Sequence, residues 1–259
     1  MLCVQPVKAF NDNYIWVLAN PDTQQAVVVD PGDSEPVLSF LDEQGWVLAA
    51  ILVTHHHPDH VGGIPALARS DLPIIGPALE KIPCRTQGVH DNDRFVLPGL
   101  GVDVEVLHIP GHTLGHVAFH IPVMSALFCG DTLFGAGCGR LFEGTAAQMH
   151  RSLQRLAALP GETQIYCGHE YTLTNLAFAQ RIEPENAYLA DRLVADRARI
   201  ARGEPTLPSR MEIEQRTNPF LRVTEASVRA AAEHYAQRPL EDGTAVFAAL
   251  RHWKDHFRA

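Results

Sequence analysis

The sequence predicts an α/β domain over residues 1–172, followed by a small all-helical domain over residues 173–259. Four short apolar runs in the first part each end at a His or an Asp, with a Gly or a Pro beside it. Strands that share one edge of a sheet bring such side chains to one place. From about residue 173 the pattern changes to Ala, Leu, Arg and Glu at helical spacing. Together these observations give the fold class and the domain boundary.

The pattern of residues 1–172 predicts short strands separated by turns. Continuous apolar runs predict buried strands, whereas alternation of apolar and polar residues predicts a half-buried one. Asn, Gly and Pro mark the turns between them. We expect strands over residues 14–18, 25–29, 49–53, 72–75, 102–107, 125–129 and 163–167, and helices over 35–44 and 64–70.

The second part contains helix-like periodicity in two long stretches and a final helix. The stretches cover residues 173–202 and 223–237, and the last helix covers residues 244–257. Gly and Pro residues at 203–208 and 237–243 break the pattern between them. The sequence contains no repeat.

Composition places the chain among ordinary globular proteins. It has 259 residues, 46% of them hydrophobic and 20% charged. No apolar run approaches the ~20 residues of a membrane span, and the first residues lack the layout of a secretory signal. Five scattered cysteines never form a C-x-x-C pair, which favours reduced thiols. We therefore expect a cytoplasmic protein that does not associate with membranes.

The net charge of −9 argues against a nucleic-acid partner, because phosphate binding requires clustered cations. The charge is unevenly distributed: residues 1–169 contain 8 Lys and Arg against 17 Asp and Glu, whereas residues 170–259 contain 13 of each. A basic-richer tail is what an anionic substrate would require. The alternative, that these arginines cover exposed helices, explains most of them equally well.

The densest set of candidate metal ligands is Thr54-His55-His56-His57-Pro58-Asp59-His60, directly after a predicted strand. Successive side chains of an extended segment alternate, so His55 and His57 face the same way. Asp59 and His60 follow a bend at Pro58 and can point to a second place nearby. Imidazole with carboxylate suits zinc, iron or manganese. The alternative is a solvated histidine-rich loop that binds metal adventitiously.

Further candidates follow other predicted strands. They are Asp30 after residues 27–29, His112 and His116 in Pro110-Gly111-His112-Thr113-Leu114-Gly115-His116, Asp131 in Gly130-Asp131-Thr132, and His169 in Gly168-His169-Glu170-Tyr171. Asp30 either orients a metal-bound group or forms an Asx-type turn.

With these motifs assembled, the sequence resembles the metallo-β-lactamase-fold hydrolases and, within them, glyoxalase II, the hydroxyacylglutathione hydrolase family. Residues 54–60 match T-H-x-H-x-D-H, and residues 110–116 match P-G-H-T-x-G-H. Narrower matches are Asn13-Tyr14, Gly137-Cys138-Gly139-Arg140, Asn218-Pro219-Phe220-Leu221-Arg222 and Arg251-x-x-Lys254-Asp255. The resemblance covers essentially the whole chain and implies an αββα sandwich followed by a helical glutathione-binding domain.

The resemblance implies two divalent metal ions per chain, with zinc favoured over iron or manganese. His55, His57 and His112 would hold one ion, Asp59, His60 and His169 the other, and Asp131 would bridge them. Asp59 and Asp131, with a hydroxide between the metals, would carry the chemistry. Asp30 and His116 would support the ligands, whereas His56 is expected to pack or to face solvent.

For substrate binding the resemblance nominates Arg140, Tyr171, Arg251 and Lys254. Arg251 and Lys254 are three residues apart, so one helical face could present both to a carboxylate. Two departures from relatives concern affinity: Arg140 stands where Lys is common, and Phe142 where some have Tyr. Cys138 is expected to pack in a loop and not to act as a nucleophile.

The implied reaction is hydrolysis of S-D-lactoylglutathione, or a similar 2-hydroxyacyl thioester, to glutathione and a 2-hydroxy acid. It would form the second step of glutathione-dependent methylglyoxal detoxification, in a monomer. Two alternatives are a persulfide dioxygenase with one non-haem iron and a non-catalytic metal-binding protein of the same fold. The helical tail argues against the dioxygenase, and the complete ligand set argues against the non-catalytic protein.

Overall fold

The computed structural model describes residues 1–258, and these form two compact units. Unit 1 consists of Met1–His108 and Leu114–Gly130, and unit 2 consists of Ile109–Thr113 and the chain from Asp131 onward. This division reflects packing and lies about forty residues before the boundary expected at residue 172. The boundary at residue 172 stays a prediction about sequence modules.

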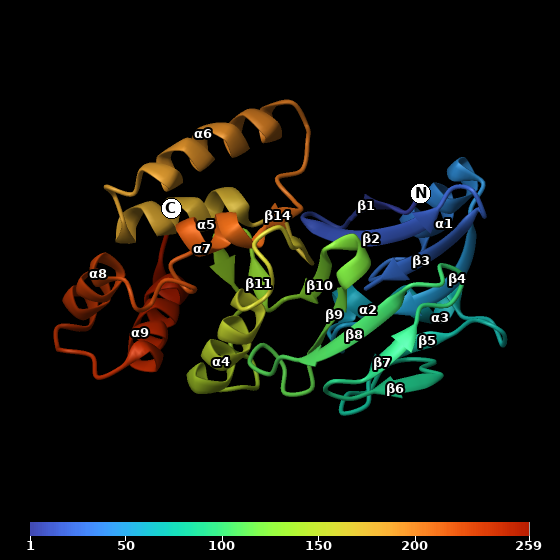
Figure 1. Ribbon diagram of the computed structural model, residues 1–259, viewed down its shortest axis with the longest axis horizontal. Coiled ribbons are helices and arrows are strands. Elements are labelled where there is room, and N and C mark those ends of the chain that lie inside the picture. The colour runs from blue at the N-terminus through green and yellow to red at the C-terminus, as the bar shows by residue number, and fades with distance from the viewer. Residues whose placement is uncertain (259) are drawn as a thin grey trace. The chain divides into compact units, whose positions relative to one another are not determined.

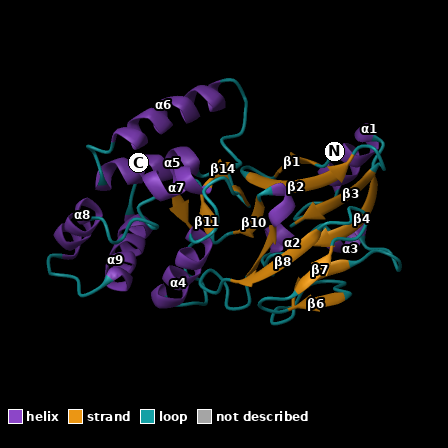
Figure 2. Ribbon diagram, in the orientation of Figure 1, coloured by secondary structure: helices purple, strands orange, loops and turns teal. Residues whose placement is uncertain are grey.

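Unit 1 contains most of the strands, together with short helices (Figures 1 and 2). Its elements in chain order are β1 (Cys3–Ala9), β2 (Asn13–Asn20), β3 (Gln25–Val29), α1 (Glu35–Gln44), β4 (Val47–Leu52), α2 (Pro58–Val61), α3 (Ile64–Leu67), β5 (Ile74–Pro77), β6 (Gln87–Val89), β7 (Arg94–Val96), β8 (Asp103–His108), β9 (Val117–Ile121), η1 (Pro122–Met124) and β10 (Ala126–Gly130).

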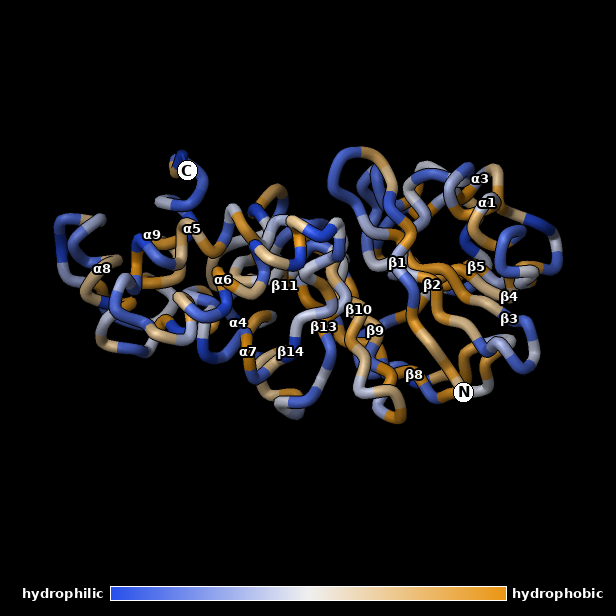
Figure 3. Tube along the Cα trace, turned by 90° about the horizontal axis from the view of Figure 1, so that it is seen from above, coloured by the Kyte–Doolittle hydropathy of each residue, from blue (hydrophilic) through white to orange (hydrophobic). Residues whose placement is uncertain are grey.

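The first sheet of unit 1 has the strand order β1-β2-β3-β4-β5-β6. β1 to β3 pair antiparallel, and β3 to β6 pair parallel. Both faces are covered, because Val27, Val28 and Val29 are each at most 1% exposed. One face packs against helices, since Val28 shares a hydrophobic cluster with Leu41 of α1 and Ile64 of α3. Parallel strands buried on both faces are continuous apolar runs, which explains why the sequence predicted β3, β4 and β5 but not β6, whose first two residues are exposed. In Figure 3, which is coloured by hydropathy, much of these strands is in the orange of hydrophobic residues.

The other strands of unit 1 form an antiparallel sheet in the order β10-β9-β8-β7. In β8, Val104 and Val106 are buried, whereas Asp103 is exposed, so the predicted alternation is confirmed. The sequence did not predict β9. All five of its residues are buried, including His120, and this polar residue interrupts an otherwise apolar run.

Two local predictions in unit 1 were wrong. Asp59 and His60 lie in the short helix α2, not in a loop. Pro58 is the first residue of that helix, where its fixed φ and missing N–H are tolerated. The helix expected over residues 64–70 ends at Leu67, because Ala68 is extended, and the following strand begins only at Ile74.

Unit 2 contains the longest helices, α6 and α9, together with short strands (Figure 2). Its elements are β11 (Leu133–Phe134), β12 (Gly137–Cys138), α4 (Ala146–Ala157), β13 (Gln164–Cys167), α5 (Thr172–Ile182), α6 (Ala187–Ala201), β14 (Ser209–Arg210), α7 (Met211–Thr217), α8 (Ala226–Ala236) and α9 (Gly243–His256).

The helical part of unit 2 is more broken than predicted. The periodic stretch 173–202 forms two helices, because the chain leaves the helix at Glu183, just before Pro184, and restarts at the N-cap Asn186. α8 begins at Ala226, three residues later than expected, and the sequence did not predict α4 or α7. α4 nevertheless carries a sequence signal, because Thr145 and Gln148 form a reciprocal capping box.

Within the described residues, no helix has the length and apolar character needed to cross a membrane. Each of the five cysteines is a free thiol, and three of them are buried.

Candidate metal centre

The histidine motif of unit 1 begins where β4 ends at the edge of the parallel sheet. His55 is fully buried, and its Nε2 lies 3.2 Å from Nδ1 of His57. The alternation of side chains predicted this proximity, and the short distance confirms it. His60, on α2, is 1% exposed, and its ring centroid lies 4.2 Å from that of His55. Three imidazoles of the motif are therefore close together.

Asp30 controls the orientation of two of these rings. Its Oδ1 accepts a hydrogen bond from the Thr54 N–H at 2.7 Å, and its Oδ2 accepts one from the Thr54 hydroxyl at 2.6 Å. The same Oδ2 lies 3.1 Å from Nδ1 of His60. Because a carboxylate oxygen only accepts, Nδ1 of His60 carries a proton, and Nε2 is the unprotonated nitrogen when the ring is neutral. This contact favours the first of the two interpretations of Asp30, in which it orients a metal-bound group, and that role stays a prediction.

Thr54 extends this arrangement to His55. Its hydroxyl hydrogen is donated to Asp30, so its oxygen accepts from Nδ1 of His55 at 3.1 Å. A neutral imidazole carries one N–H, and His55 consequently presents an unprotonated Nε2. Donor atoms of Asp30, His55 and His60 lie within 4.8 Å of one another. No sequence pattern predicted this role of Thr54.

Asp59 is held by Asn13, at the start of β2. The Asn13 Nδ2 donates to Asp59 Oδ2 at 3.0 Å, and that oxygen lies 3.6 Å from Nε2 of His60. Asn13 is buried. The sequence indicated it only as part of the motif Asn13-Tyr14, without a role. The structure shows what it does: it fixes the direction of a candidate ligand.

His116 lies directly behind His55. The two rings stack at 4.6 Å with 17° between their planes, and His116 is completely buried. Gly130 completes this packing, because a Cβ at that position would lie 2.3 Å from Thr54 Oγ1 and 2.8 Å from His116 Nε2. Its φ of +46° also favours glycine. His116 therefore packs against His55, and its role in supporting a metal ligand stays a prediction.

His56 differs from the expectation of packing or free solvent contact. Its Nδ1 lies 2.9 Å from Oε2 of Glu80, a carboxylate that is itself 3% exposed in its side chain. The other oxygen of Glu80 accepts from the Gly115 N–H. His56 is thus tied to the loop after β5.

Unit 2 holds the other group of candidate ligands around Asp131. Nε2 of His112 lies 3.5 Å from Asp131 Oδ2, and Nε2 of His169 lies 3.2 Å from the same oxygen. Nδ1 of His112 is 2.9 Å from the backbone carbonyl of Arg140, so it donates its proton there. The neutral ring then presents a lone pair to a carboxylate oxygen. Two such acceptors tolerate each other when a cation lies between them, so this donor set fits a divalent metal ion.

Tyr171 and Phe142 border this group. Tyr171 stacks on His169, with centroids 4.8 Å apart and 5° between the planes, and is 36% exposed. Phe142 packs edge-on against His112 at 5.2 Å and is 64% exposed. Tyr171, a predicted substrate contact, and Phe142, a departure from relatives, therefore each lie next to a candidate ligand of unit 2.

The cations nominated for substrate binding are placed differently from one another. Arg140 is largely exposed, whereas Arg251 is 4% exposed. The Arg251 guanidinium donates to the Cys138 carbonyl at 2.9 Å and to Asp255 Oδ1 at 2.8 Å. Lys254 is half-buried, with Nζ 5.4 Å from the Phe178 ring centroid. Two positions three residues apart on α9 thus have different surroundings: the Arg251 side chain is bonded inward, and the Lys254 side chain is partly exposed.

Burial changes the titration of two groups here. Desolvation, with Arg251 as the next cause, lowers the pKa of Lys254 to about 8. Desolvation raises the pKa of Cys138 to about 11, against the opposing effect of Arg251. Cys138 therefore remains a thiol at neutral pH, which agrees with a packing role and not with a nucleophile.

Other arginines of the C-terminal part fit neither of the two uses considered for them. Arg192 pairs with the fully buried Glu214 at 2.7 Å, and Arg222 pairs with Glu183 at 2.8 Å. Both arginines pair with buried carboxylates inside the protein. The number of arginines in this part of the chain therefore overestimates the positive charge on its surface.

Comparison with known proteins agrees with the motifs. The family model of the metallo-beta-lactamase superfamily matches residues 10–169, and the model described as hydroxyacylglutathione hydrolase C-terminus matches residues 170–257. Relatives named hydroxyacylglutathione hydrolase include those of Pseudomonas fluorescens, 53% identical over 99% of this chain and all of the relative, and Nitrosomonas europaea, 49% identical over all of this chain and 97% of the relative.

Solved structures show the same fold. ETHE1 from Myxococcus xanthus matches with a TM-score of 0.65 at 22% identity, over 99% of this chain and 90% of its own. TTHA1623, in a di-iron-bound form, matches with a TM-score of 0.55 at 32% identity, over 64% of this chain and 91% of its own. The predicted fold class, a metallo-β-lactamase fold followed by a helical C-terminal domain, is confirmed. The chain belongs to the hydroxyacylglutathione hydrolase family of the metallo-β-lactamase superfamily.

Proposed function

We propose that this protein is a thioesterase that hydrolyses 2-hydroxyacyl thioesters of glutathione, chiefly S-D-lactoylglutathione. Full-length similarity to hydroxyacylglutathione hydrolases supports the substrate class. The observation that carries the chemistry is Asp131, whose Oδ2 faces Nε2 of both His112 and His169. A carboxylate oxygen approached by two imidazole nitrogens is the arrangement expected of a ligand shared by two cations.

The proposed ligand set follows the family assignment. His55, His57 and His112 hold one divalent ion, Asp59, His60 and His169 hold the other, and Asp131 is common to both. Contacts within each unit support it, because Asp30, Thr54 and the Arg140 carbonyl face Nδ1 of His60, His55 and His112, so that Nε2 is the unprotonated nitrogen of each neutral ring. Zinc is the proposed metal, and iron and manganese suit the same donors.

When bound, two such cations lower the pKa of water and polarise a carbonyl. The residues of the chain supply the geometry: Asn13 holds Asp59, and Asp131 contributes negative charge where two histidines meet. In the overall reaction the oxygen of water bonds to the thioester carbon and the C–S bond breaks. Glutathione leaves as the thiol, and the acyl group becomes a 2-hydroxy carboxylate. No step requires a protein nucleophile.

Arg140, Tyr171 and Lys254 are the proposed contacts for the carboxylates and peptide of glutathione. Arg251 acts differently, because its guanidinium donates inward to the carbonyl and sulfur of Cys138 and to Asp255. We propose that it orders the end of the substrate site around Asp255, which also lies 4.0 Å from Arg140 Nε. The protein is expected to work as a cytoplasmic monomer.

Thioester hydrolysis and metal content test this function directly. Metal-loaded protein is expected to hold about two metal ions per chain, as a two-metal site requires, and to hydrolyse S-D-lactoylglutathione rapidly. One iron per chain, with oxygen uptake on glutathione persulfide and no thioester hydrolysis, would establish the dioxygenase instead. Two metal ions without any hydrolysis would leave the metal site intact and remove the proposed substrate.

The pKa of Lys254 predicts how substrate affinity depends on pH. The ammonium is charged below about pH 8 and loses its charge above it. KM for S-D-lactoylglutathione should therefore rise between pH 7 and pH 9, by roughly twofold to fivefold, as expected for a partly exposed ion pair. Lys254→Arg remains charged over this range and should give a flat KM profile. An equal rise in both proteins would show that Lys254 does not hold a substrate carboxylate.

A further inference from the structure

The short hairpin of β11 and β12 is bound along its backbone by side chains from the helical part of unit 2. We name residues 131–140 the Asp131 hairpin, because Asp131 begins it and Arg140 ends it. Asn218 Nδ2 donates to the carbonyls of Phe134 and Gly137, and Asn175 Nδ2 donates to that of Gly135. The Ala136 N–H donates to Glu214 Oε2 at 2.8 Å, and Arg251 donates to the Cys138 carbonyl. Five consecutive residues thus have their backbone groups bonded by four side chains.

The hairpin and the helices approach so closely that a Cβ at either of two hairpin glycines would overlap a neighbouring side chain. A Cβ at Gly135 would lie 2.4 Å from Thr172 Oγ1, and a Cβ at Gly137 would lie 2.3 Å from Asn175 Nδ2. Ala136 has a φ of +53°, so the turn is held in a conformation that non-glycine residues rarely adopt. The surrounding hydrogen bonds over-determine this conformation, and such backbone is common at functional sites.

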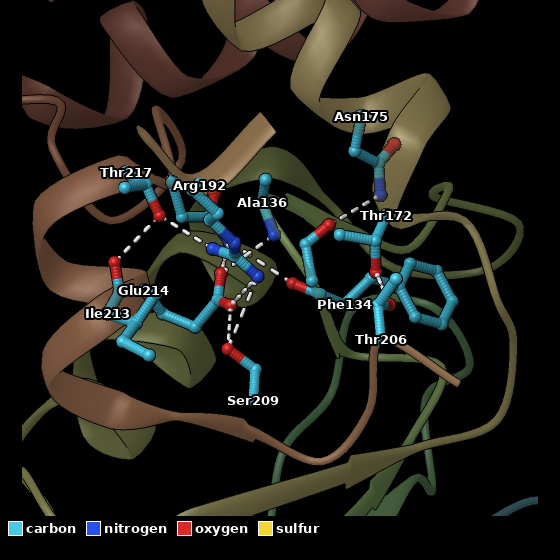
Figure 4. Close-up of polar contacts among 12 residues, drawn as sticks. Phe134, Ala136, Thr172, Asn175, Arg192, Thr206, Ser209, Ile213, Glu214 and Thr217 are labelled. Atoms are coloured by element: carbon cyan, nitrogen blue, oxygen red, sulfur yellow. Dashed lines mark hydrogen bonds and ion pairs between the residues drawn. The ribbon is translucent and has the colours of Figure 1, made fainter. Parts of the chain in front are cut away.

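Glu214 is the centre of this arrangement (Figure 4). Its side chain is fully buried on α7, and Oε1 accepts from Arg192 at 2.7 Å and from the Ser209 hydroxyl. The other oxygen, Oε2, accepts from the Ala136 N–H and from Asn218. Arg192 also donates to Thr217 at 2.6 Å. One carboxylate therefore links α6, α7 and β14 to the turn of the hairpin.

A buried ion pair is a poor source of stability, because desolvation offsets most of the attraction. An apolar pair of similar volume would serve α6 and α7 about as well. Only a carboxylate with two satisfied oxygens, however, can hold both Arg192 and the Ala136 N–H. Unlike an apolar residue, Glu214 can thus fix the position of the hairpin through its bond to the Ala136 N–H.

We propose that Glu214 is a positioning residue for Asp131. Its bond to Ala136, with those of Asn218 and Asn175, holds the hairpin so that Asp131 Oδ2 lies between His112 and His169. The other end of the hairpin matters in the same way, because the Arg140 carbonyl holds Nδ1 of His112. The helices α6 and α7 thereby set the metal affinity of ligands that lie outside them. The metal-binding role rests on the proposed ligand set, and its catalytic meaning rests on the proposed reaction.

The structure offers a matched control in Glu183. This carboxylate is also buried, accepts two bonds from Arg222 at 2.8 and 3.0 Å, and accepts one from Ser227 at 2.7 Å. None of these partners belongs to the Asp131 hairpin. Glu183→Gln and Glu214→Gln therefore make the same chemical change in two buried ion pairs of unit 2.

The experiment compares these two variants in the full chain by chelator competition with Zn²⁺ and by amide hydrogen exchange of the metal-free protein. Both variants are expected to lower the melting temperature. Only Glu214→Gln should weaken binding of the more weakly held ion, by about 10–100-fold, as for other residues that orient metal ligands. It alone should accelerate exchange of the Ala136 amide. Equal Zn²⁺ affinity in the two variants would overturn the proposal.

A milder variant covers the case in which Glu214→Gln does not fold. Asn175→Ala removes the bond to the Gly135 carbonyl and leaves the Glu214–Arg192 pair intact. It should weaken Zn²⁺ binding in the same direction by a smaller factor, and unchanged affinity would contradict the proposal. Neither readout uses a thioester. If the wild-type protein binds two ions and hydrolyses none, the positioning role survives and only the proposed function fails.

Discussion

Asp131→Asn should lower kcat/KM for S-D-lactoylglutathione on the order of 10³-fold, comparable with the loss of a principal electrostatic group in other active sites. The substitution keeps the shape of the side chain but removes its charge. In the native protein, Oδ2 is the point that Nε2 of His112 and Nε2 of His169 both approach, at 3.5 and 3.2 Å. An amide cannot compensate two cations there, so at least one ion should be lost as well.

Elemental analysis and steady-state kinetics on the same preparation test this expectation. Asp191→Asn, on the exposed face of α6, makes the same change away from any candidate ligand and should keep full activity and metal content. If Asp131→Asn retained two ions and more than about a tenth of the activity, Asp131 would not be shared between metals.

Asp30→Asn should have the second-largest effect, although Asp30 is not itself a proposed ligand. The amide keeps one acceptor oxygen and places an NH₂ group where two donors now converge. If its oxygen continues to accept the Thr54 N–H, the amide nitrogen faces the Thr54 hydroxyl and Nδ1 of His60. His60 and, through Thr54, His55 then lose the partner that fixes their tautomers. Metal affinity should fall about 10–100-fold.

The same substitution should destabilise the metal-free protein by about 1–3 kcal/mol, the cost of leaving buried donors unsatisfied. A loss of stability in the metal-free protein would distinguish Asp30 from residues whose substitution changes metal affinity alone. Urea unfolding of the apoprotein measures it, with the largely exposed Asp71→Asn as the control. A variant with native metal affinity and reduced stability would show that Asp30 serves the fold alone.

The sequence predicted the inner strands β2 to β5 of the first sheet well, because their pattern is local, whereas it did not predict the edge strands β1 and β6. A run such as residues 25–29 is apolar on both sides of the strand, and few other structures require that. The ligands were recognisable for the same reason: four lie within residues 54–60, and the others follow strand ends beside Gly or Pro. Family comparison confirms the fold class, whereas the individual ligand assignments stay predictions.

The supporting roles of Asn13 and Glu214 could not be predicted, because they depend on contacts between distant segments. Asn13 and Asp59 are 46 residues apart, and Glu214 and Ala136 are 78 apart. Nothing in the local pattern of α7 distinguishes Glu214 from a glutamate on an exposed helix face. The inward bonds of Arg251 were missed for a related reason: spacing along a helix gives the face of a side chain, not whether that face is buried.

The bonds to the Asp131 hairpin limit how this protein can exchange parts with its relatives. The two family models meet between residues 169 and 170, so recombination at that junction would separate the hairpin from Asn175, Glu214, Asn218 and Arg251. A chimera would assemble its metal site only if the incoming helices supplied equivalent donors and acceptors at all four positions. Sequence modules and functional modules are therefore different in this chain, and the ligand motifs alone do not make a transferable metal site.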